Sequence, residues 1–480
     1  MEFSIQKSDR FSTGFFLDNK QKKGFSPYQG RDELFLTQQG NISLKQEILK
    51  LIEQSSLVIK ICSFIITDRE IFEVLLEKVK ARQVAVFVLT QLDPSKLKNT
   101  TTMAEHVTAE ELGENPAHTH LYYIKALFDQ GAHVRAATTA HAKFLVIDRN
   151  QGLLMSANLT TPSLNLNTES GVYLQRETVV ELDRLFDVIF QHGTRYRQYF
   201  TANKSKAFVV STTERVSTEH LLIDPSSRLR YTYEQHTHQL YETIVEYLDQ
   251  AHDYVYLSTY SIVGLEKLPE FTRAVEAAIS RGVGIYIFCR GMNYRSDHLK
   301  NTLLLAQMGC KVFGDVYNHS KGIINESAGM IFTANIDGNH GLTNGFEVGY
   351  ILNQTQRTAF LDLHLELIAS SPYIFHAEPE RKELFETYGG YEVVKGLKPP
   401  VFPDDLEIHG LKGLSLAEAD FKKHVIFYAR KQQDDFLLIG TELYRCQYHT
   451  GKFTILSREH HRTDLEKYIL KFNNLKIALN

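Results

Sequence analysis

The residues of this chain best suited to chemistry are a histidine and a lysine that recur in two matched sets. The first set is His141-Ala142-Lys143, Asp148 and Ser156-Ala157-Asn158, and the second set is His319-Ser320-Lys321, Glu326 and Thr333-Ala334-Asn335. A glutamate follows each histidine by 28 residues, Glu169 in the first set and Glu347 in the second. Two histidines, two lysines and two carboxylates at matched spacing predict one active site assembled from two half-sites.

These residue types suit attack on a phosphodiester. Its negative charge repels nucleophiles, and lysines such as Lys143 and Lys321 can neutralise its non-bridging oxygens. A neutral imidazole can attack phosphorus and form a covalent phosphohistidine, while a second, protonated imidazole donates to the leaving oxygen and later accepts a proton from water. Histidine suits both tasks because its unperturbed pKa is about 6.5. A carboxylate on the other ring nitrogen would fix the tautomer, and Glu169 and Glu347 are the candidates.

Short apolar runs predict that strands carry these sets. Residues 144–147 are uninterruptedly apolar, which suits a buried strand. Side chains alternate along a strand, so His141 and Lys143 are expected on one face. Residues 322–324 occupy the same place in the second set. The side chains expected to hydrogen bond phosphate oxygens are Ser156, Asn158, Thr333 and Asn335.

The two sets resemble the signature of the phospholipase D superfamily, which is His-x-Lys, four residues, Asp, six residues, Gly-Ser-x-Asn. The first set fits every spacing, with Met155 in place of glycine. The second set has Glu326 for the aspartate, a Phe-Thr pair for Gly-Ser, and one residue fewer before Asn335. The resemblance implies a structural role for the aspartate and chemistry that needs no metal or other cofactor. It also implies that His141 is the nucleophile and His319 the general acid, with the reverse assignment open.

The pattern of strands and helices repeats along with the two sets. The strand-like run at residues 57–64 resembles the one at residues 254–260, and each follows a helical pattern, at residues 44–54 and 238–250. Both parts continue in the same order: a helix, a second strand, another helix, the motif strands, the strand of the glutamate and a closing helix. Such alternation predicts an α/β fold. Together with the resemblance, it predicts two duplicated phospholipase D-like α/β/α sandwich halves with pseudo-two-fold symmetry, plus a small β-rich C-terminal domain.

The predicted domains follow from changes in this pattern. They are an N-terminal arm at residues 1–34, the first half at 35–208, the second half at 209–378, a linker at 379–403 and the β-rich domain, with a final helix at 463–472, at 404–480. Two segments read as insertions that differ between the halves, a polar segment at residues 93–116 and a Gly/Asn-rich loop at 337–345. Loops on a rigid scaffold often carry specificity. Both are therefore candidates for the wall of a substrate groove, with ordinary surface connections as the alternative.

The C-terminal domain mixes basic and aromatic residues. They are Lys422, Lys423, Tyr428, Arg430, Lys431, Tyr444, Arg445 and Tyr448. This mixture suits nucleic acid, because basic side chains contact phosphates and aromatic rings stack on bases. A protein contact or a plain amphipathic surface would use the same residues, and the sequence leaves the three readings open.

The composition limits the classes of function. The 480 residues carry a formal net charge of −4, so binding to nucleic acid would need a local positive groove rather than bulk basicity. None of the four cysteines forms a Cys-x-x-Cys pair, which speaks against zinc and predicts reduced core residues. There is no pattern typical of a signal peptide and no apolar run of about 18 residues. We therefore expect a cytoplasmic protein without a transmembrane segment.

Three functions remain in view. The first is a metal-independent nuclease that cuts DNA or RNA through a covalent phosphohistidine, with nucleic acid as its partner. Intracellular superfamily members of this kind resemble effectors that act beside helicases or ATPases in bacterial defence systems, so such a protein is a candidate partner. The second function is a phospholipase D or phosphatidyl transferase acting on phospholipids. The third is a non-catalytic module that binds nucleic acid or protein.

Overall fold

The structure is a computed structural model of the chain. It describes residues 2–4, 14–24, 33–38, 40–92, 116–193, 195–198, 224, 226–291, 296–380, 383, 387, 407–409, 425–431, 434–439, 442–449, 452–458 and 475–476. The chain divides into two compact units. Unit 1 comprises Met1–Gly24, Arg290–Val316 and Ala369–Asn480, and unit 2 comprises Phe25–Cys289 and Tyr317–Ile368. Every residue of the predicted active site belongs to unit 2.

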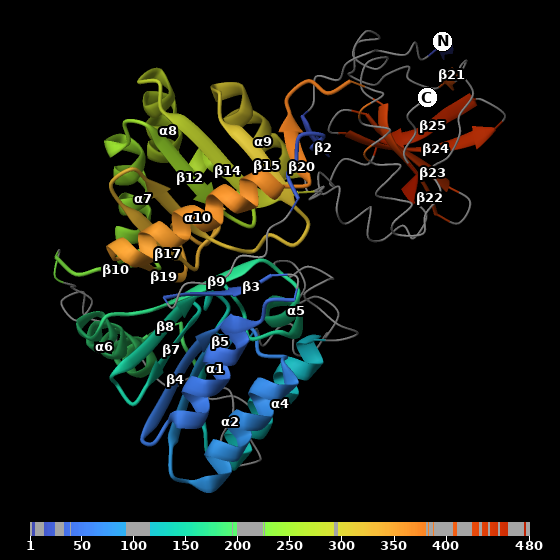
Figure 1. The fold of residues 1–480 in the computed structure, drawn as a ribbon. Helices are drawn as coiled ribbons and strands as arrows, with labels where there is room; N and C mark the ends of the chain where they lie inside the picture. The colour runs from blue at the N-terminus through green and yellow to red at the C-terminus, as the bar shows by residue number, and fades with distance from the viewer. Residues whose placement is uncertain are drawn as a thin grey trace. The chain divides into compact units, whose positions relative to one another are not determined.

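The first sheet of unit 2 has the strand order β3-β9-β8-β7-β4-β5-β6. Its strands are β3 (Leu34–Thr37), β4 (Val58–Ser63), β5 (Ala85–Gln91), β6 (His133–Ala137), β7 (Phe144–Ile147), β8 (Gln151–Met155) and β9 (Glu169–Tyr173). Strands β4, β5 and β6 are parallel, and the remaining pairs are antiparallel. Helices α1 (Ser43–Gln54), α2 (Arg69–Ala81) and α4 (Pro116–Gln130) cover one face, and α6 (Arg176–His192) covers the other (Figure 1).

Strand β4 illustrates how the sequence divides this sheet between its two helical layers. Ile59 and Ile61 point into the apolar core shared with α1, α2 and α4. Lys60 points to the opposite face, where its Nζ lies 2.5 Å from Asp183 Oδ1 and 2.7 Å from Asp187 Oδ1, both on α6. The period-two alternation of a strand therefore places apolar contacts on one side and a buried ion pair on the other.

The second sheet of unit 2 has the strand order β11-β10-β19-β17-β16-β12-β14. Its strands are β10 (Leu229–Tyr233), β11 (Thr237–His238), β12 (Tyr254–Ser258), β14 (Gly284–Arg290), β16 (Gly322–Asn325), β17 (Gly329–Phe332) and β19 (Phe346–Ile351). Its helices are α7 (Gln239–Gln250), α8 (Pro269–Ser280) and α10 (Gln354–Ser370). Two short strands, β13 (Ile262–Val263) and β18 (Ile336–Asp337), pair apart from it, and the 3-10 helix Leu265–Lys267 follows β13.

The two sheets share one arrangement. The order β3-β9-β8-β7-β4-β5 of the first sheet recurs in the second as β10-β19-β17-β16-β12-β14. Helices α1, α2 and α6 occupy the same places along the chain as α7, α8 and α10. The predicted mixed α/β fold class is confirmed, and the matched order supports the predicted duplication.

One expected difference between the halves is not extra chain. Short helix α5 (Thr161–Asn165) lies between the first asparagine and Glu169, and the Gly/Asn-rich loop at residues 337–345 lies between the second asparagine and Glu347. Because both histidine–glutamate spacings are 28 residues, the loop replaces a short helix rather than adding a segment. The reading of this loop as an insertion was therefore wrong.

Unit 1 contains two groups of strands. In the first, β2 (Phe15–Asp18) pairs with β20 (Tyr373–His376), which pairs with β15 (Lys311–Asp315), and α9 (Ser296–Met308) belongs to the same unit. Part of the predicted N-terminal arm is thus a strand. The second group has the order β1-β21-β25-β24-β23-β22-β26. Its strands are β1 (Glu2–Ser4), β21 (Glu407–His409), β22 (Val425–Lys431), β23 (Asp434–Ile439), β24 (Glu442–His449), β25 (Lys452–Arg458) and β26 (Leu475–Lys476).

Several predicted features lie outside the described residues. These are residues 93–115 of the polar segment, most of the linker, Lys422, Lys423 and the helix at 463–472. The predicted domain boundaries therefore stay predictions. None of the helices in the described ranges has both the length and the apolar composition needed to cross a bilayer. Cys62, Cys289 and Cys310 are buried with free thiols, as the sequence predicted for core cysteines.

Candidate active site

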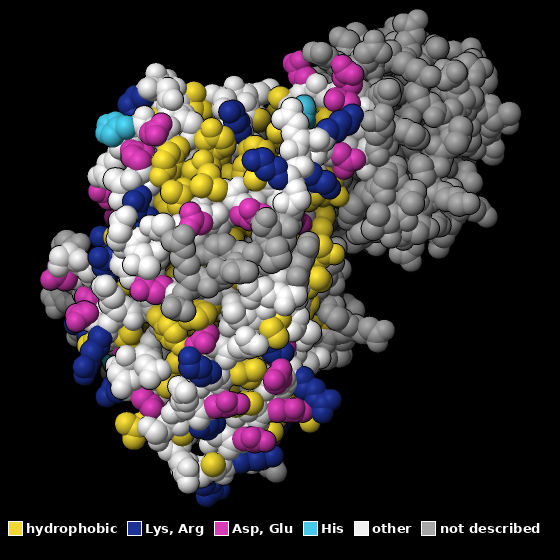
Figure 2. Space-filling model, viewed as in Figure 1, with side chains coloured by type: hydrophobic (Ala, Val, Ile, Leu, Met, Phe, Trp, Pro, Cys, Tyr) yellow, Lys and Arg dark blue, Asp and Glu magenta, His cyan; other side chains and the backbone are white. Residues whose placement is uncertain are grey.

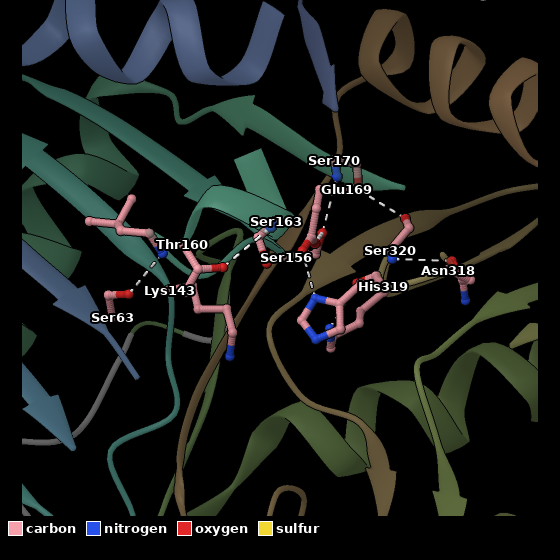
Figure 3. A network of polar contacts seen from close by, with 12 residues as sticks. Ser63, Lys143, Ser156, Thr160, Ser163, Glu169, Ser170, Asn318, His319 and Ser320 are labelled. Carbon is pink, nitrogen blue, oxygen red and sulfur yellow. Dashed lines mark hydrogen bonds and ion pairs between the residues drawn. The ribbon is translucent and has the colours of Figure 1, made fainter. Parts of the chain in front are cut away.

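The two sets lie together, and each histidine contacts the glutamate of the other set. His141 Nδ1 lies 2.5 Å from Glu347 Oε1, and His319 Nδ1 lies 2.7 Å from Glu169 Oε1, the pair drawn in Figure 3. Both glutamates are fully buried. Because Nδ1 of each ring faces a carboxylate, Nε2 is the ring nitrogen on the side away from the glutamate. We call His141, Lys143 and Glu347 the His141 half-site, and His319, Lys321 and Glu169 the His319 half-site.

Two short backbone bridges bring the sets together. Thr168 pairs in parallel with Asn318, and Ala140 pairs in parallel with Phe346. His319 N donates to Thr168 O at 3.0 Å, and Phe346 N donates to Thr139 O at 3.2 Å. In both bridges, the residue before a glutamate pairs with the residue before the histidine of the other set. Each histidine and its glutamate therefore stand side by side in register.

A hydroxyl group donates a hydrogen bond to the second carboxylate oxygen of each glutamate. Ser156 Oγ donates to Glu169 Oε2 at 2.5 Å, and Thr333 Oγ1 donates to Glu347 Oε2 at 2.5 Å. Each hydroxyl also accepts the backbone N–H of the residue that follows its glutamate. Thr333 thus makes in the irregular second set the same contacts that Ser156 makes in the first. Their hydrogen bonding to a phosphate stays a prediction.

Both lysines are fully buried within the site. Lys143 Nζ donates to His141 O at 2.5 Å and lies 3.2 Å from Nδ1 and 3.3 Å from Nε2 of the same ring. Lys321 Nζ donates to His319 O at 2.8 Å. The sequence predicted that the alternation of a strand includes His141 and Lys143, but the motif residues precede β7 and β16 instead of lying within these strands. Each lysine folds back over its own motif. A positive charge therefore sits beside each imidazole.

The two asparagines have a feature in common that suits a ligand. The buried side-chain oxygens of Asn158 and Asn335 have no hydrogen-bond partner among the described residues. The assignment of an amide oxygen and nitrogen depends on the surrounding hydrogen bonds, so either group of each amide can face this position. A buried polar group without a partner favours a substrate or water contact there.

The electrostatic environments of the two half-sites differ. Burial lowers the pKa of His141, and the charge of Lys143 acts in the same direction against the opposing effect of Glu347. Burial acts to raise the pKa of Glu347, but the charge and hydrogen bond of His141 outweigh it and hold that pKa below its usual value. Burial raises the pKa of Glu169 to about 7, although the charge of Lys321 opposes the rise. At neutral pH the His141 half-site thus pairs a neutral imidazole with an ionised carboxylate.

Each histidine also meets an aromatic ring that sequence reasoning did not single out. The ring centroids of Phe64 and His141 lie 5.3 Å apart at an interplanar angle of 70°, and those of Tyr260 and His319 lie 5.0 Å apart at 71°. Such edge contacts restrict the plane of the imidazole. Phe64 follows β4 and Tyr260 follows β12 by nearly the same interval, so the repeat of these strands was the signal that could have identified them.

The acidic residue after each lysine has a structural position, as the resemblance implied. The Asp148 carboxylate accepts hydrogen bonds from the backbone N–H groups of Ser56, Leu57 and Val58, at the start of β4. Glu326 accepts the N–H of His252 just before β12. The substitution of glutamate for aspartate in the second set therefore keeps this contact with the neighbouring strand.

The Gly/Asn-rich loop at residues 337–345 borders the His141 half-site. A Cβ added to Gly341 would lie 3.3 Å from Glu347 Oε1 and 3.5 Å from Asn335 O, so the close approach of the loop to the carboxylate suits glycine. Within the described residues, no group of three or more histidine, cysteine, aspartate or glutamate side chains is arranged to hold a metal ion.

Comparison with known proteins adds one family. Residues 48–192 match the family model described as cardiolipin synthase, PLD-like domain. No curated protein matches the sequence. Since the matched residues include His141, Lys143, Ser156, Asn158 and Glu169, the match covers the whole first set.

Three solved structures resemble the fold weakly. Polyphosphate kinase from Porphyromonas gingivalis is 14% identical with a TM-score of 0.43, over 67% of this chain and 44% of that chain. Phosphatidylserine synthase from Haemophilus influenzae Rd KW20 is 11% identical with a TM-score of 0.48, over 80% of this chain and 96% of that chain. Nuc, a phospholipase D family member from Salmonella typhimurium, is 19% identical with a TM-score of 0.27, over 31% of this chain and 98% of that chain.

The family match covers the residues of the first set and their surroundings. The model match spans β4 to α6, which are the elements that position His141, Lys143 and Glu169. The weak structural likenesses carry no argument about activity. Residues 48–192, which hold the first set, therefore match a phospholipase D-like domain.

Proposed function

We propose that this protein is a phosphodiesterase that acts through a covalent phosphohistidine. The crosswise pairs of His141 with Glu347 and of His319 with Glu169 carry the proposal. In each pair Nδ1 faces the glutamate and Nε2 lies on the opposite side of the ring, so one centre offers two histidines for two different tasks. Two buried lysines supply the positive charge that a phosphodiester requires.

In the first step of the proposed reaction, neutral His141 attacks phosphorus through Nε2. The new N–P bond forms as the bond from phosphorus to the leaving oxygen breaks. His319, protonated on Nε2, donates that proton to the leaving oxygen. The lowered pKa of His141 favours the neutral ring that this attack needs. Glu347 takes the hydrogen bond from Nδ1 and stabilises the positive charge that develops on the ring.

In the second step, His319 accepts a proton from water through Nε2 as the water oxygen attacks phosphorus. The N–P bond to His141 breaks, and both histidines return to their starting protonation states. An alcohol in place of water would give transfer of the phosphoryl group instead of hydrolysis. No metal ion takes part in either step, so a chelator is expected to leave the chemistry intact.

Nucleic acid is the substrate that we propose first, with the protein as a metal-independent nuclease on DNA or RNA. Support comes from the C-terminal strands, where Tyr428 and Arg430 lie on β22 and Tyr444 and Tyr448 lie on β24. Both strands pair with β23, so these basic and aromatic residues share one sheet.

On the face drawn in Figure 2, acidic and basic side chains of the described residues are interspersed rather than gathered by sign.

Phospholipid is the second candidate substrate, and one observation favours it. The family model that matches residues 48–192 carries the description cardiolipin synthase, PLD-like domain. The proposed chemistry serves a phospholipid equally well, because its headgroup is joined by a phosphodiester. In that case the protein would be a phospholipase D or a phosphatidyl transferase.

One paired assay separates these substrates. Wild type and His141→Ala would be incubated with labelled single- and double-stranded DNA and RNA in EDTA, and separately with phosphatidylcholine and phosphatidylglycerol vesicles. Cleavage of nucleic acid that the variant loses would support the nuclease. Release or exchange of headgroups without nucleic-acid cleavage would transfer the proposal to lipid. Binding of nucleic acid without turnover of any diester would contradict the proposed enzyme and favour the non-catalytic binding module.

A further inference from the structure

The residues that flank the two histidine–glutamate pairs differ systematically in polarity. Asn318 and Ser320 flank His319, and Thr168 and Ser170 flank its partner Glu169. The corresponding residues of the other half-site are all apolar, namely Ala140, Ala142, Phe346 and Val348. All eight of these residues are buried. The four residues that flank His319 and Glu169 in the chain are thus polar, and the four at the matched positions beside His141 and Glu347 are apolar.

Three of these polar residues, Asn318, Ser320 and Ser170, form a network beside His319 and Glu169. Ser170 Oγ and Ser320 Oγ lie 3.0 Å apart and join β9, which carries Glu169, to the segment of His319 that precedes β16, as Figure 3 shows. Ser320 N donates to Asn318 Oδ1 at 3.2 Å. The Asn318 amide donates to Thr259 O at 2.9 Å, next to the residue whose ring packs on His319. Hydrogen bonds therefore link the segments that carry Glu169 and His319 to the backbone just after β12, an interior strand of the second sheet.

At the His141 half-site, no side chain at the matched positions can form such bonds. Alanine and valine carry no polar side-chain atom, so Ala142 and Val348 can contact each other only through apolar packing. Hydrogen bonds restrict direction as well as distance, whereas apolar contacts restrict mainly distance. The His141 side chain is also more exposed, at 23% against 6% for His319.

This difference matches the two tasks in the proposed reaction. A proton-transfer group must meet its partner at hydrogen-bond distance in both steps, about 2.6–3.2 Å between heavy atoms. A nucleophile instead has to close from about 3–3.5 Å to bonding distance at phosphorus. Fixed orientation therefore serves the acid–base histidine, and freedom along the line of attack serves the nucleophile.

We infer that Ser170, Ser320 and Asn318 are positioning residues that hold His319 and Glu169 for proton transfer. The inference rests on the proposed two-histidine reaction for the meaning of these tasks. These three residues touch no reacting atom and act through His319 and Glu169.

The chain itself provides the variants that test this inference. Ser170→Val with Ser320→Ala copies the Val348 and Ala142 pair into the His319 half-site. The reciprocal control, Ala142→Ser with Val348→Ser, copies the hydroxyl pair behind His141. The single variants Ser320→Ala and Ser170→Ala are smaller changes and serve if the double variant does not fold.

The first readout needs no turnover. The full chain would be labelled on its histidine rings, and the signals of His319 and His141 would be assigned by their loss in His319→Gln and His141→Gln. Titration of these signals reports the ring and the charged groups that face it, which for His319 are Glu169 and Lys321. We expect Ser170→Val with Ser320→Ala to change the titration of His319 and to leave that of His141 in place. An unchanged His319 signal would overturn the inference.

The second readout compares leaving groups. A nitrophenyl diester leaves with little help from an acid, whereas an alkoxide needs a proton. Loss of a buried hydrogen bond of this kind predicts roughly tenfold slower release of an alkoxide in the double variant, with a much smaller effect on the nitrophenyl diester. Equal loss on both substrates would contradict a role in proton transfer. If wild type cleaves no diester while the His319 signal still shifts, the proposed function fails and the positioning network stands.

Discussion

Replacing Glu347 by glutamine should impair His141 rather than His319, although Glu347 follows His319 in the sequence. The structure places Glu347 Oε1 2.5 Å from His141 Nδ1, in a site where the carboxylate is fully buried. Glutamine keeps the size of the side chain and can still accept a hydrogen bond, so the main loss is the charge. A hydrogen bond to a charged group contributes about 1.5–3 kcal/mol, which corresponds to a rate loss of roughly 10- to 150-fold.

Single-turnover kinetics would locate this loss within the reaction. Glu347→Gln should slow formation of the phosphohistidine, because the positive charge that develops on His141 is no longer compensated. Glu169→Gln is the matched control and should instead slow release of a poor leaving group and hydrolysis of the intermediate. The reasoning would be refuted if Glu347→Gln left formation of the intermediate at the wild-type rate, or if the two variants exchanged their effects.

Three further predictions concern charge and stability. Lys143→Met should move the acid limb of the pH–rate profile to higher pH, because the Lys143 charge helps to hold the pKa of His141 down and a protonated His141 cannot attack; a limb that stays in place would count against this. Burial lowers the pKa of His120 to about 4, so folding favours the neutral ring. The contribution of this ring to the free energy of unfolding should be fully present above about pH 6.5 and fall by about 3 kcal/mol as the pH drops to 4. Urea unfolding should show a flatter pH dependence in His120→Gln, and an unchanged slope would contradict the prediction. Lys60→Met removes one partner of a buried ion pair with Asp183 and should cost about 3–5 kcal/mol, whereas a loss below about 1 kcal/mol would show that the pair contributes little.

Much of the fold could be predicted because its signals are local. Apolar runs and helical patterns repeat around both sets, and the strands and helices appear in the order expected. The place of the Gly/Asn-rich loop was harder to judge, because composition does not reveal that α5 fills the same interval in the first half. The equal spacing of 28 residues from histidine to glutamate shows that the two halves have the same length in this interval.

The crosswise pairing could not be predicted from spacing. The interval of 28 residues ties Glu169 to His141 along the chain, while contacts across the bridges tie Glu169 to His319 in space. The hydrogen bond from Ser156 to Glu169 could not be predicted for the same reason. From the sequence, a serine near a predicted phosphate site is interpreted as a phosphate ligand. Tertiary contacts between residues far apart in sequence decide both partners.

The central claim is that two sets of residues form one active site in which His141 carries the phosphoryl group. Its most direct test is to trap the intermediate from a radiolabelled diester, chosen from those the protein cleaves, with quenching under alkaline conditions that preserve phosphohistidine. We predict label on His141 in wild type, more of it in His319→Ala, and none in His141→Ala. Label that persists in His141→Ala, or turnover by His141→Ala at the wild-type rate, would contradict the account.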